Sequence, residues 1–241
     1  MKPSVLNLLL AGGIILLGLL GLLLGETQLT TAQISEALAV PTSGPGDVVF
    51  GIRLPRTVAA LTVGAALGLA GAVMQGLLRN PLADPGVLGV SGGAGLGAAL
   101  AISFGLAIHP GAIEAAALSA ALGVGLMLTW LAARFREPEI LILFGVALSA
   151  FLGAMTSLVF NFSPSPVALA EVFSWLLGSV ANRDWDDIAR QLPAMGVGAL
   201  LCIYAARGLV MLTLGEEAAA LSGLPMTRLR ACAVAGASLL T

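Results

Sequence analysis

The sequence predicts an all-α protein, built as a polytopic bundle of transmembrane helices. Of its 241 residues, 58% are hydrophobic and only 10% are charged, whereas soluble domains average about 25% charged residues. The mean hydropathy is +1.01. The apolar residues gather in runs of about 20, the length of a helix that crosses a bilayer. These runs lack the period-two alternation of a membrane-spanning barrel, so the spans are expected to be helices.

Six apolar runs are long enough to be complete spans, and a seventh begins near the C-terminus. The spans are expected at residues 4–24, 57–78, 91–108, 112–133, 140–160 and 192–210, with the seventh starting near Ala231. The first run is longer than the apolar part of a typical signal peptide, and no clear cleavage site follows it. We therefore interpret it as a retained helix, and residues 1–241 as a single transmembrane domain.

Two segments between the spans look irregular. Residues 26–52 are expected to form a polar linker on the outer side, since they contain two prolines and few long apolar runs. Residues 166–177 are apolar but too short to cross a bilayer. Ser165 followed by Pro166 is a favourable start for a helix. We therefore expect a half-helix at the outer mouth, buried in protein or lining a cavity.

The basic residues indicate an orientation in the membrane. With Lys2 placed in the cytoplasm and the spans alternating, more lysines and arginines fall on the cytoplasmic side than on the outer side. This distribution follows the positive-inside rule. The N-terminus and residues 134–139 are then cytoplasmic, and residues 182–187 lie outside.

Small residues recur at four-residue intervals on the second and third predicted spans. They are Gly64, Gly68, Ala72 and Gly76 on the second span, and Gly93 and Gly97 on the third. Residues four apart share a helix face, and a face of small residues allows another backbone to approach closely. We interpret these positions as helix-packing sites.

Residue patterns for catalysis or metal binding are scarce. The predicted spans carry no charged or histidine side chain away from their ends, although proton- and ion-coupled carriers usually need such groups. The stretch GVSGG at 89–93 fits a hydrolase pattern, but Ser91 and the single histidine, His109, would lie about 27 Å apart along one helix. No nucleotide-binding or metalloprotease motif occurs. We expect no enzyme activity, no cofactor and no metal site, and the net charge of −2 gives no sign of a nucleic-acid partner.

Four sequence blocks occur in an order that is typical of one transporter family. They are RLPR at 53–56, GAALGLAGAVMQGLLRNPLADPGVLGVSGGAGLGA at 64–98, WLLGS at 175–179 and LGEEAA at 214–219. The chain thereby resembles the permease subunits of ABC importers for iron-siderophores, haem and vitamin B12. The resemblance implies an inner-membrane permease of about ten helices that pairs with a second permease copy. It also implies two cytoplasmic ATPase subunits and a periplasmic substrate-binding protein as partners.

The resemblance further implies a coupling element on the cytoplasmic side, within residues 211–230. In the family, the loop that carries LGEEAA fits into a cleft of the ATPase. The matching residues here are Leu214, Gly215, Glu216, Glu217, Ala218, Ala219 and the nearby Gly223. The family usually continues with Leu-Gly, whereas this chain has LSG at 221–223, which leaves the register after Ala219 open. We expect two short helices that join near Gly223.

Charged and proline-rich stretches bracket the second span. Arg53 and Arg56 lie three residues apart at its outer end, so they are expected to share one face. The resemblance implies that they receive glutamates of the binding protein, and planar guanidinium groups suit carboxylates. At the inner end, a structural turn into the third span is expected from Asn80, Pro81, Asp84 and Pro85. A purely structural role for both stretches stays open as the alternative.

The expected function is that of the permease subunit of a binding-protein-dependent ABC importer. The expected substrate is a ferric siderophore or a related iron or tetrapyrrole chelate, such as haem or cobalamin. ATP hydrolysis would take place on the partner subunits. The last third of the family pattern is absent, so the sequence resembles a C-terminally truncated member. Two alternatives stay open: a secondary carrier, and a membrane scaffold that does not transport.

Overall fold

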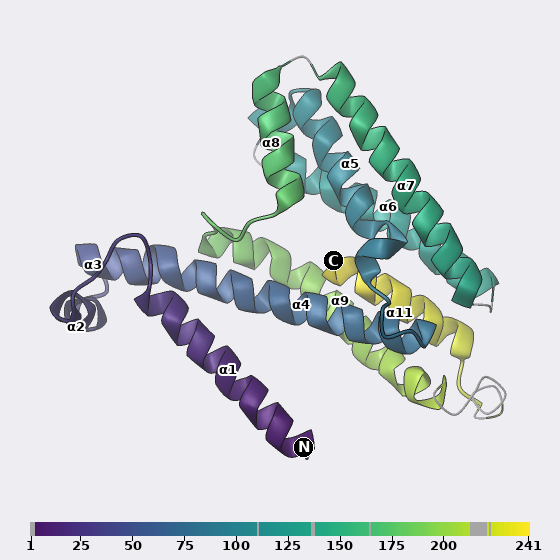
Figure 1. Ribbon diagram of the computed structural model, residues 1–241, viewed down its shortest axis with the longest axis horizontal. Helices are drawn as coiled ribbons and strands as arrows, with labels where there is room; N and C mark the ends of the chain where they lie inside the picture. The colour runs from purple at the N-terminus through teal and green to yellow at the C-terminus, as the bar shows by residue number, and fades with distance from the viewer. Residues whose placement is uncertain (1–2, 110, 136–137, 164, 213–220, 222) are drawn as a thin grey trace. The chain divides into compact units, whose positions relative to one another are not determined.

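The structure is a computed structural model that describes residues 3–109, 111–135, 138–163, 165–212, 221 and 223–241 (Figure 1). Within these ranges, all regular secondary structure is helical and no strand occurs. The predicted all-α fold class is therefore confirmed.

The first part of the chain contains one long N-terminal helix, a short connecting region and a second long helix. These elements are α1 (Pro3–Leu23), α2 (Thr31–Ala39), α3 (Gly44–Gly46), the π-helical η1 (Asp47–Arg53) and α4 (Leu54–Leu78). The remaining elements are the 3₁₀ turn η2 (Pro85–Leu88), α5 (Val90–Ser103), the 3₁₀ turn η3 (Leu106–Ile108), α6 (Ala112–Arg134), α7 (Pro138–Phe162), α8 (Pro166–Leu177), α9 (Trp185–Leu212) and α11 (Met226–Leu240).

Among the described residues, five helical stretches are long and apolar enough to cross a membrane. They are Ser4–Leu23, Gly44–Leu78, Ala112–Arg134, Glu139–Phe162 and Trp185–Leu212. Each overlaps a predicted span, and the second and fifth begin earlier than predicted. The seventh predicted run also forms a helix, α11, which begins five residues before the expected start at Ala231.

The third predicted span, 91–108, is shorter in the structure than the sequence suggested. Its helix, α5, has 14 residues, or about 21 Å at 1.5 Å per residue, which is less than the ~30 Å hydrocarbon core. The helix stops because Gly105 adopts a left-handed φ of 72°, which an α-helix cannot continue through. Apolar composition alone did not reveal this break.

The segment 26–52 is more helical than the predicted linker. α2 begins with a capping box, in which Thr30 Oγ1 accepts from the backbone N–H of Gln33 at 3.3 Å and Gln33 Oε1 accepts from that of Thr30 at 2.9 Å. Further on, Ser43 Oγ accepts from the N–H of Gly46. From Gly44 the chain is helical without interruption for 35 residues. Local capping therefore starts helices in a stretch whose composition favoured a loop.

The predicted half-helix is confirmed as α8. It contains Pro166–Leu177, and Ser165 Oγ accepts from the backbone N–H of Val167 at 3.2 Å. Val172 on this helix is buried together with Ala99 and Ile102 of α5. α8 thus packs against α5 along the apolar face that Val172 occupies.

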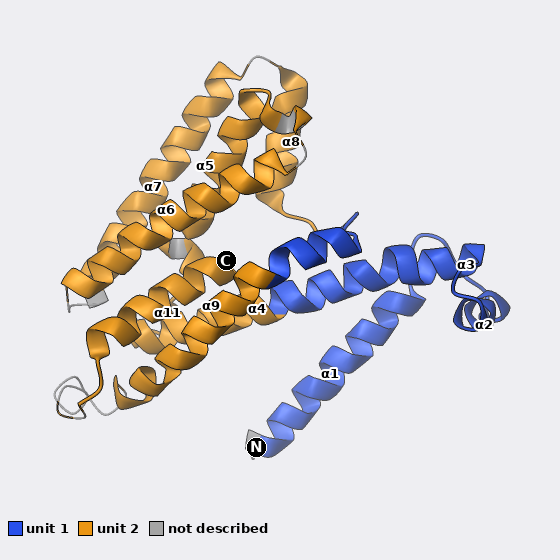
Figure 2. Cartoon of the chain, turned by 180° about the vertical axis from the view of Figure 1, so that it is seen from behind, with its two compact units in different colours: residues 1–64, 180–192 blue, residues 65–179, 193–241 orange. Residues whose placement is uncertain are grey.

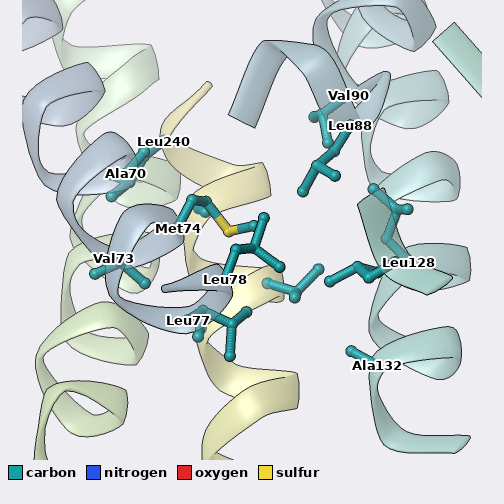
Figure 3. Close-up of a cluster of buried hydrophobic side chains, with 14 of the residues drawn as sticks. Ala70, Val73, Met74, Leu77, Leu78, Leu88, Val90, Leu128, Ala132 and Leu240 are labelled. Atoms are coloured by element: carbon teal, nitrogen blue, oxygen red, sulfur yellow. The ribbon is translucent and has the colours of Figure 1, made fainter. Parts of the chain in front are cut away.

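The chain divides into two compact units (Figure 2). The first contains residues 1–64 and 180–192, and the second contains residues 65–179 and 193–241. The second unit holds the larger apolar core. Met74 of α4 and Leu128 of α6 are fully buried in it, with Val90 of α5 and Val234 of α11 nearly so. Figure 3 shows part of this cluster, where side chains of α4 and α6 point toward one another.

Candidate functional site

Arg53, the first arginine of the RLPR block, lies inside the first unit. Its side chain is only 6% exposed. Nη1 donates to the carbonyl oxygens of Leu22 at 2.9 Å and Leu23 at 2.7 Å. Nη2 donates to the carbonyl oxygen of Thr27. The guanidinium group therefore binds the C-terminal end of α1 and the chain just beyond it.

The cause of this arrangement is the polarity of a helix end. The last carbonyl groups of an α-helix have no intrahelical donor, and they carry the negative end of the helix dipole. A cation that donates to these carbonyl groups supplies the missing hydrogen bonds and also neutralises the negative end of the dipole. A hydrogen bond with one charged partner contributes about 1.5–3 kcal/mol. Gly25 makes the approach possible, because a Cβ at that position would lie 3.0 Å from Arg53 Nε.

Arg56 is placed differently. Its side chain is exposed, and within the described part of the chain it makes no ion pair. Arg53 and Arg56, which the sequence places on one face of the helix, therefore differ in exposure: Arg53 is buried against the end of α1 and Arg56 lies at the surface. The docking role of both stays a prediction.

The start of α9 forms a second polar cluster in the same unit. Asp184 Oδ1 accepts from the backbone N–H of Asp187 at 2.8 Å, which caps the helix. The carboxylate of Asp187 pairs with Arg190 at 2.8 Å and with Arg183 at 3.8 Å. Trp185 Nε1 donates to the carbonyl oxygen of Phe50 in η1 at 3.3 Å. Trp185 thus connects residues 180–192 to the π-helical segment that ends at Arg53.

The turn between α4 and α5 is built by two side-chain caps. Asn80 Oδ1 accepts from the backbone N–H of Leu82 at 2.9 Å. Asp84 Oδ1 accepts from that of Gly86 at 2.6 Å, and Pro85 occupies the first position of η2. Gly89 then adopts a left-handed φ of 91°. Asn80, Pro81, Asp84 and Pro85 thus all lie in the connection between the two helices.

The glycines predicted to pack helices behave in two ways. Gly93 and Gly97 lie against α6, where a Cβ would come within 2.7 Å of Val124 and 2.5 Å of the Ala116 carbonyl oxygen, respectively. A Cβ added to Gly76 would lie 3.5 Å from the side chain of Leu209 of α9. A Cβ added to Gly64 or Gly68 would meet no atom within 4 Å among the described residues, and Ala72 is exposed. The packing role of these three positions stays a prediction.

The predicted coupling residues fall mostly outside the described part of the chain. Leu214, Gly215, Glu216, Glu217, Ala218 and Ala219 lie outside the described residues. Gly223 is described and adopts a left-handed φ of 72° with no neighbour within 4 Å. The helices on either side are antiparallel, since Gly208 of α9 contacts Leu229 of α11 and Gly198 contacts Leu240. The connection between them therefore starts and finishes at the same end of this helix pair.

Sequence reasoning missed one set of residues at this site. Gly18 and Gly21 of α1 face Leu61 and Thr57 of α4: a Cβ added to each would lie 3.8 Å from Leu61 and 3.1 Å from Thr57, respectively. Gly25 continues the series at Arg53. Their spacing of three and four residues was visible in the sequence, but the first span was expected to be an ordinary leucine-rich helix. Among the described residues, no group of three His, Cys, Asp or Glu could hold a metal ion.

Comparison with known proteins gives the family. The model of the FecCD transport family matches residues 13–241. The chain belongs to the FecCD transport family. Its predicted recognition as a relative of siderophore, haem and vitamin B12 permeases is thereby confirmed at the level of the family.

Two relatives show how similar the chain is to individual permease proteins. It is 38% identical over 201 residues to an uncharacterized ABC transporter permease protein, YvrB, of Bacillus subtilis, which covers 81% of this chain and 56% of the relative. It is 41% identical over 179 residues to the vitamin B12 import system permease protein BtuC of Citrobacter koseri, which covers 74% of this chain and 54% of the relative. The FecCD chain thus spans about half the length of these curated relatives.

A solved structure has the same fold. It is described as an inward-facing conformation of an ABC transporter of metal-chelate type, and it is 31% identical to this chain with a TM-score of 0.77. The alignment covers 94% of this chain and 70% of that one. The FecCD chain therefore has the helical fold of an ABC transporter permease.

Proposed function

We propose that this FecCD chain acts as the transmembrane permease subunit of a binding-protein-dependent ABC importer in the cell inner membrane. The family match over residues 13–241 is the observation that supports this most strongly. The fold adds support, because five described stretches have the length and composition of membrane spans. In this proposal the N-terminus is cytoplasmic, as the arginine distribution indicates.

The proposed substrate is a large metal or tetrapyrrole chelate, that is, a ferric siderophore, haem or cobalamin. The named function of the BtuC relatives and the metal-chelate type of the similar structure support this class. The exposed small residues of α4, which include Gly64 and Gly68, are compatible with it, because they leave open space beside the helix. A transport pathway lined by small residues would select the substrate by its shape, and the binding protein would provide most of the substrate specificity.

The energy for transport comes, in this proposal, from two ATPase subunits that dock at residues 211–230. The antiparallel arrangement of α9 and α11 supports the position, because it leaves both ends of this connection at one end of the helix pair. Arg134, at the C-terminal end of α6, is exposed, and the proposed orientation places it on the same cytoplasmic side as this connection. A second permease copy would complete the membrane part of the importer.

An uptake measurement tests the proposal. The chain is produced with an ATPase and a binding protein of an importer of this family, and membrane vesicles are supplied with labelled cobalamin, haem or a ferric siderophore. We expect uptake of one of these compounds that requires both ATP and the binding protein. Uptake driven by a proton gradient without ATP would instead identify a secondary carrier, and assembly without any uptake would favour a scaffold.

A substitution in the LGEEAA block tests the coupling assignment. Gly215→Trp places a large ring where close approach to the ATPase is proposed, so it should uncouple ATP hydrolysis from the loaded binding protein. Gly12→Trp is the matched control, since Gly12 of α1 has no neighbour within 4 Å. Normal stimulation of ATPase activity in the Gly215 variant would refute the assignment.

A further inference from the structure

One face of α6 is buried against neighbouring helices of the second unit. Its residues are Ala117, Ala121, Val124, Gly125, Leu128, Leu131 and Ala132. A Cβ added to Gly125 would lie 2.7 Å from the Cβ of Ser238 on α11, and one added to Gly93 on α5 would lie 2.7 Å from Val124. Figure 3 shows Leu128 of this face pointing toward side chains of α4. Most residues of the buried face are glycine or alanine, as is usual where helices approach closely in lipid.

The opposite face of α6 presents large side chains in its C-terminal half. Leu126, Trp130 and Arg134 are four residues apart and therefore share that face. Leu126 is 68% exposed and Trp130 is 63% exposed, and Arg134 is exposed as well. Helix contacts inside a membrane are made mostly by small residues. This set of three, the 126–134 stripe, therefore fits a surface that faces lipid rather than another helix.

The depth of the 126–134 stripe in a bilayer follows from the charges at the two ends of α6. Glu114 lies in the first turn and Arg134 in the last turn, and both are exposed. The helix between them is about 30 Å long, which equals the thickness of the hydrocarbon core. Arg134 then lies at the level of the lipid headgroups. Trp130 lies about 6 Å deeper, in the interfacial layer where tryptophans are enriched, and Leu126 lies among the acyl chains.

The guanidinium group of Arg134 is available to a ligand. Among the described residues it takes part in no ion pair. Glu139, in the first turn of α7, is the nearest described acid along the chain, and no ion pair joins it to Arg134. A guanidinium group can bind two phosphate oxygens through parallel N–H donors. The phosphate of a lipid headgroup therefore matches Arg134 in charge, in geometry and in depth.

We propose that Trp130 and Arg134 form a binding site for the headgroup of an anionic phospholipid, in the leaflet around the C-terminal end of α6. Arg134 binds the phosphate, the Trp130 ring lies beside the glycerol region, and Leu126 contacts an acyl chain. Phosphatidylcholine has the same phosphate but adds a positive choline, so Arg134 favours a headgroup with a net negative charge, such as phosphatidylglycerol. The site requires only that the chain lies in a membrane, and it is independent of the proposed transport function.

The fluorescence of Trp130 reports which lipid lies beside the 126–134 stripe. The chain has three tryptophans, so Trp175 and Trp185 are replaced by phenylalanine in the full chain. The protein is placed in vesicles of phosphatidylcholine and phosphatidylglycerol in equal amounts, and one of the two lipids carries brominated acyl chains, which quench tryptophan on contact. The ratio of the two quenching efficiencies gives the lipid preference. Both leaflets contain both lipids, so the result depends neither on the orientation nor on transport.

We expect phosphatidylglycerol to be preferred beside Trp130 about fivefold, which corresponds to about 1 kcal/mol. Arg134→Gln should abolish this preference, because it removes the charge that selects the headgroup. Arg207→Gln is the matched control, since Arg207 is exposed on another helix, α9, and its substitution removes the same charge. The control should keep the preference. An equal loss in both variants would show attraction to the total charge of the protein and would overturn the proposal.

Two results with Arg134 intact would also contradict the proposal, so it stays testable even if Arg134→Gln does not accumulate in membranes. Absence of quenching by either brominated lipid would show that another helix or a second copy of the chain covers this face. Equal quenching by both lipids would show a lipid contact without selection of the headgroup.

A competition experiment distinguishes a lipid from free phosphate. Glycerol phosphate has the phosphate but no acyl chains, so it cannot make the contact with Leu126. At constant ionic strength it should leave the preference for phosphatidylglycerol unchanged. Loss of the preference at millimolar glycerol phosphate would identify a site for soluble phosphates and would overturn the assignment to a lipid.

Discussion

The backbone of Gly97 on α5 lies so close to the carbonyl of Ala116 on α6 that an added Cβ would be 2.5 Å from its oxygen. Gly93, one turn earlier, is confined by the Val124 side chain, which an added Cβ would approach to 2.7 Å. Helices in lipid gain little from burying apolar side chains, since the solvent is itself apolar, and they depend on such close packing instead. The α5–α6 contact is therefore sensitive to a single methyl group.

Gly97→Ala should destabilise the protein by about 1–3 kcal/mol, the range for overpacked sites. Gly123→Ala on α6 is the control, because no atom lies within 4 Å of the Cβ it would add. There the better helix propensity of alanine should instead stabilise by roughly 0.5–1 kcal/mol. Unfolding in mixed detergent micelles measures both changes. A change in the free energy of unfolding with the same sign in both variants would contradict the packing assignment.

Asp84→Ala should weaken the turn between α4 and α5. It removes the carboxylate that accepts from the N–H of Gly86 at 2.6 Å, and loss of such a cap costs about 0.5–2 kcal/mol. Asp84→Asn keeps an acceptor oxygen, so it should lose much less stability than Asp84→Ala. Protease sensitivity of the turn in membrane vesicles distinguishes the two variants. An Asn variant as sensitive as the Ala variant would show that the negative charge matters, not the cap.

Arg56→Glu should weaken docking of the proposed binding protein more than Arg56→Ala, because it places like charges face to face. Loss of one charge-assisted contact corresponds to about one to two decades in affinity. A binding protein with a reversed charge should recover part of the loss, and the effect should shrink at high salt. Binding in lipid discs at two salt concentrations measures this. An affinity that changes neither with the salt concentration nor with substitution of Arg56 would exclude the docking role.

The orientation in the membrane can be checked with single cysteines. In a background without Cys202 and Cys232, a cysteine at Arg134 should react with a membrane-impermeant reagent only from the cytoplasmic side. A cysteine at Asp186 should react only from outside. Both positions are exposed at the ends of long helices. Labelling of Arg134→Cys from outside would invert the topology and with it the docking and coupling proposals.

The helices themselves were largely predictable, because their signals are local. A run of about 20 apolar residues specifies a membrane helix wherever it occurs, and Ser165-Pro166 marked the start of α8 to the residue. The break at Gly105 was harder to foresee, since a glycine continues a helix or ends it according to its surroundings. Capping by Thr30 and Ser43 likewise formed helices where composition favoured a linker.

The sequence by itself determined the fold class, the positions of most helices and membership of a transporter family. Only the tertiary structure decided which glycine faces pack within the described residues: Gly93 and Gly97 meet α6, whereas a Cβ added to Gly64 or Gly68 would meet no atom within 4 Å. It also decided that Arg53 turns inward while Arg56 stays exposed. The physical reason is that lipid is as apolar as a helix interior, so hydrophobic periodicity does not mark the inner face of a membrane helix. The choice of neighbour then depends on residues distant in sequence, such as the carbonyls of Leu22 and Leu23 that bind Arg53.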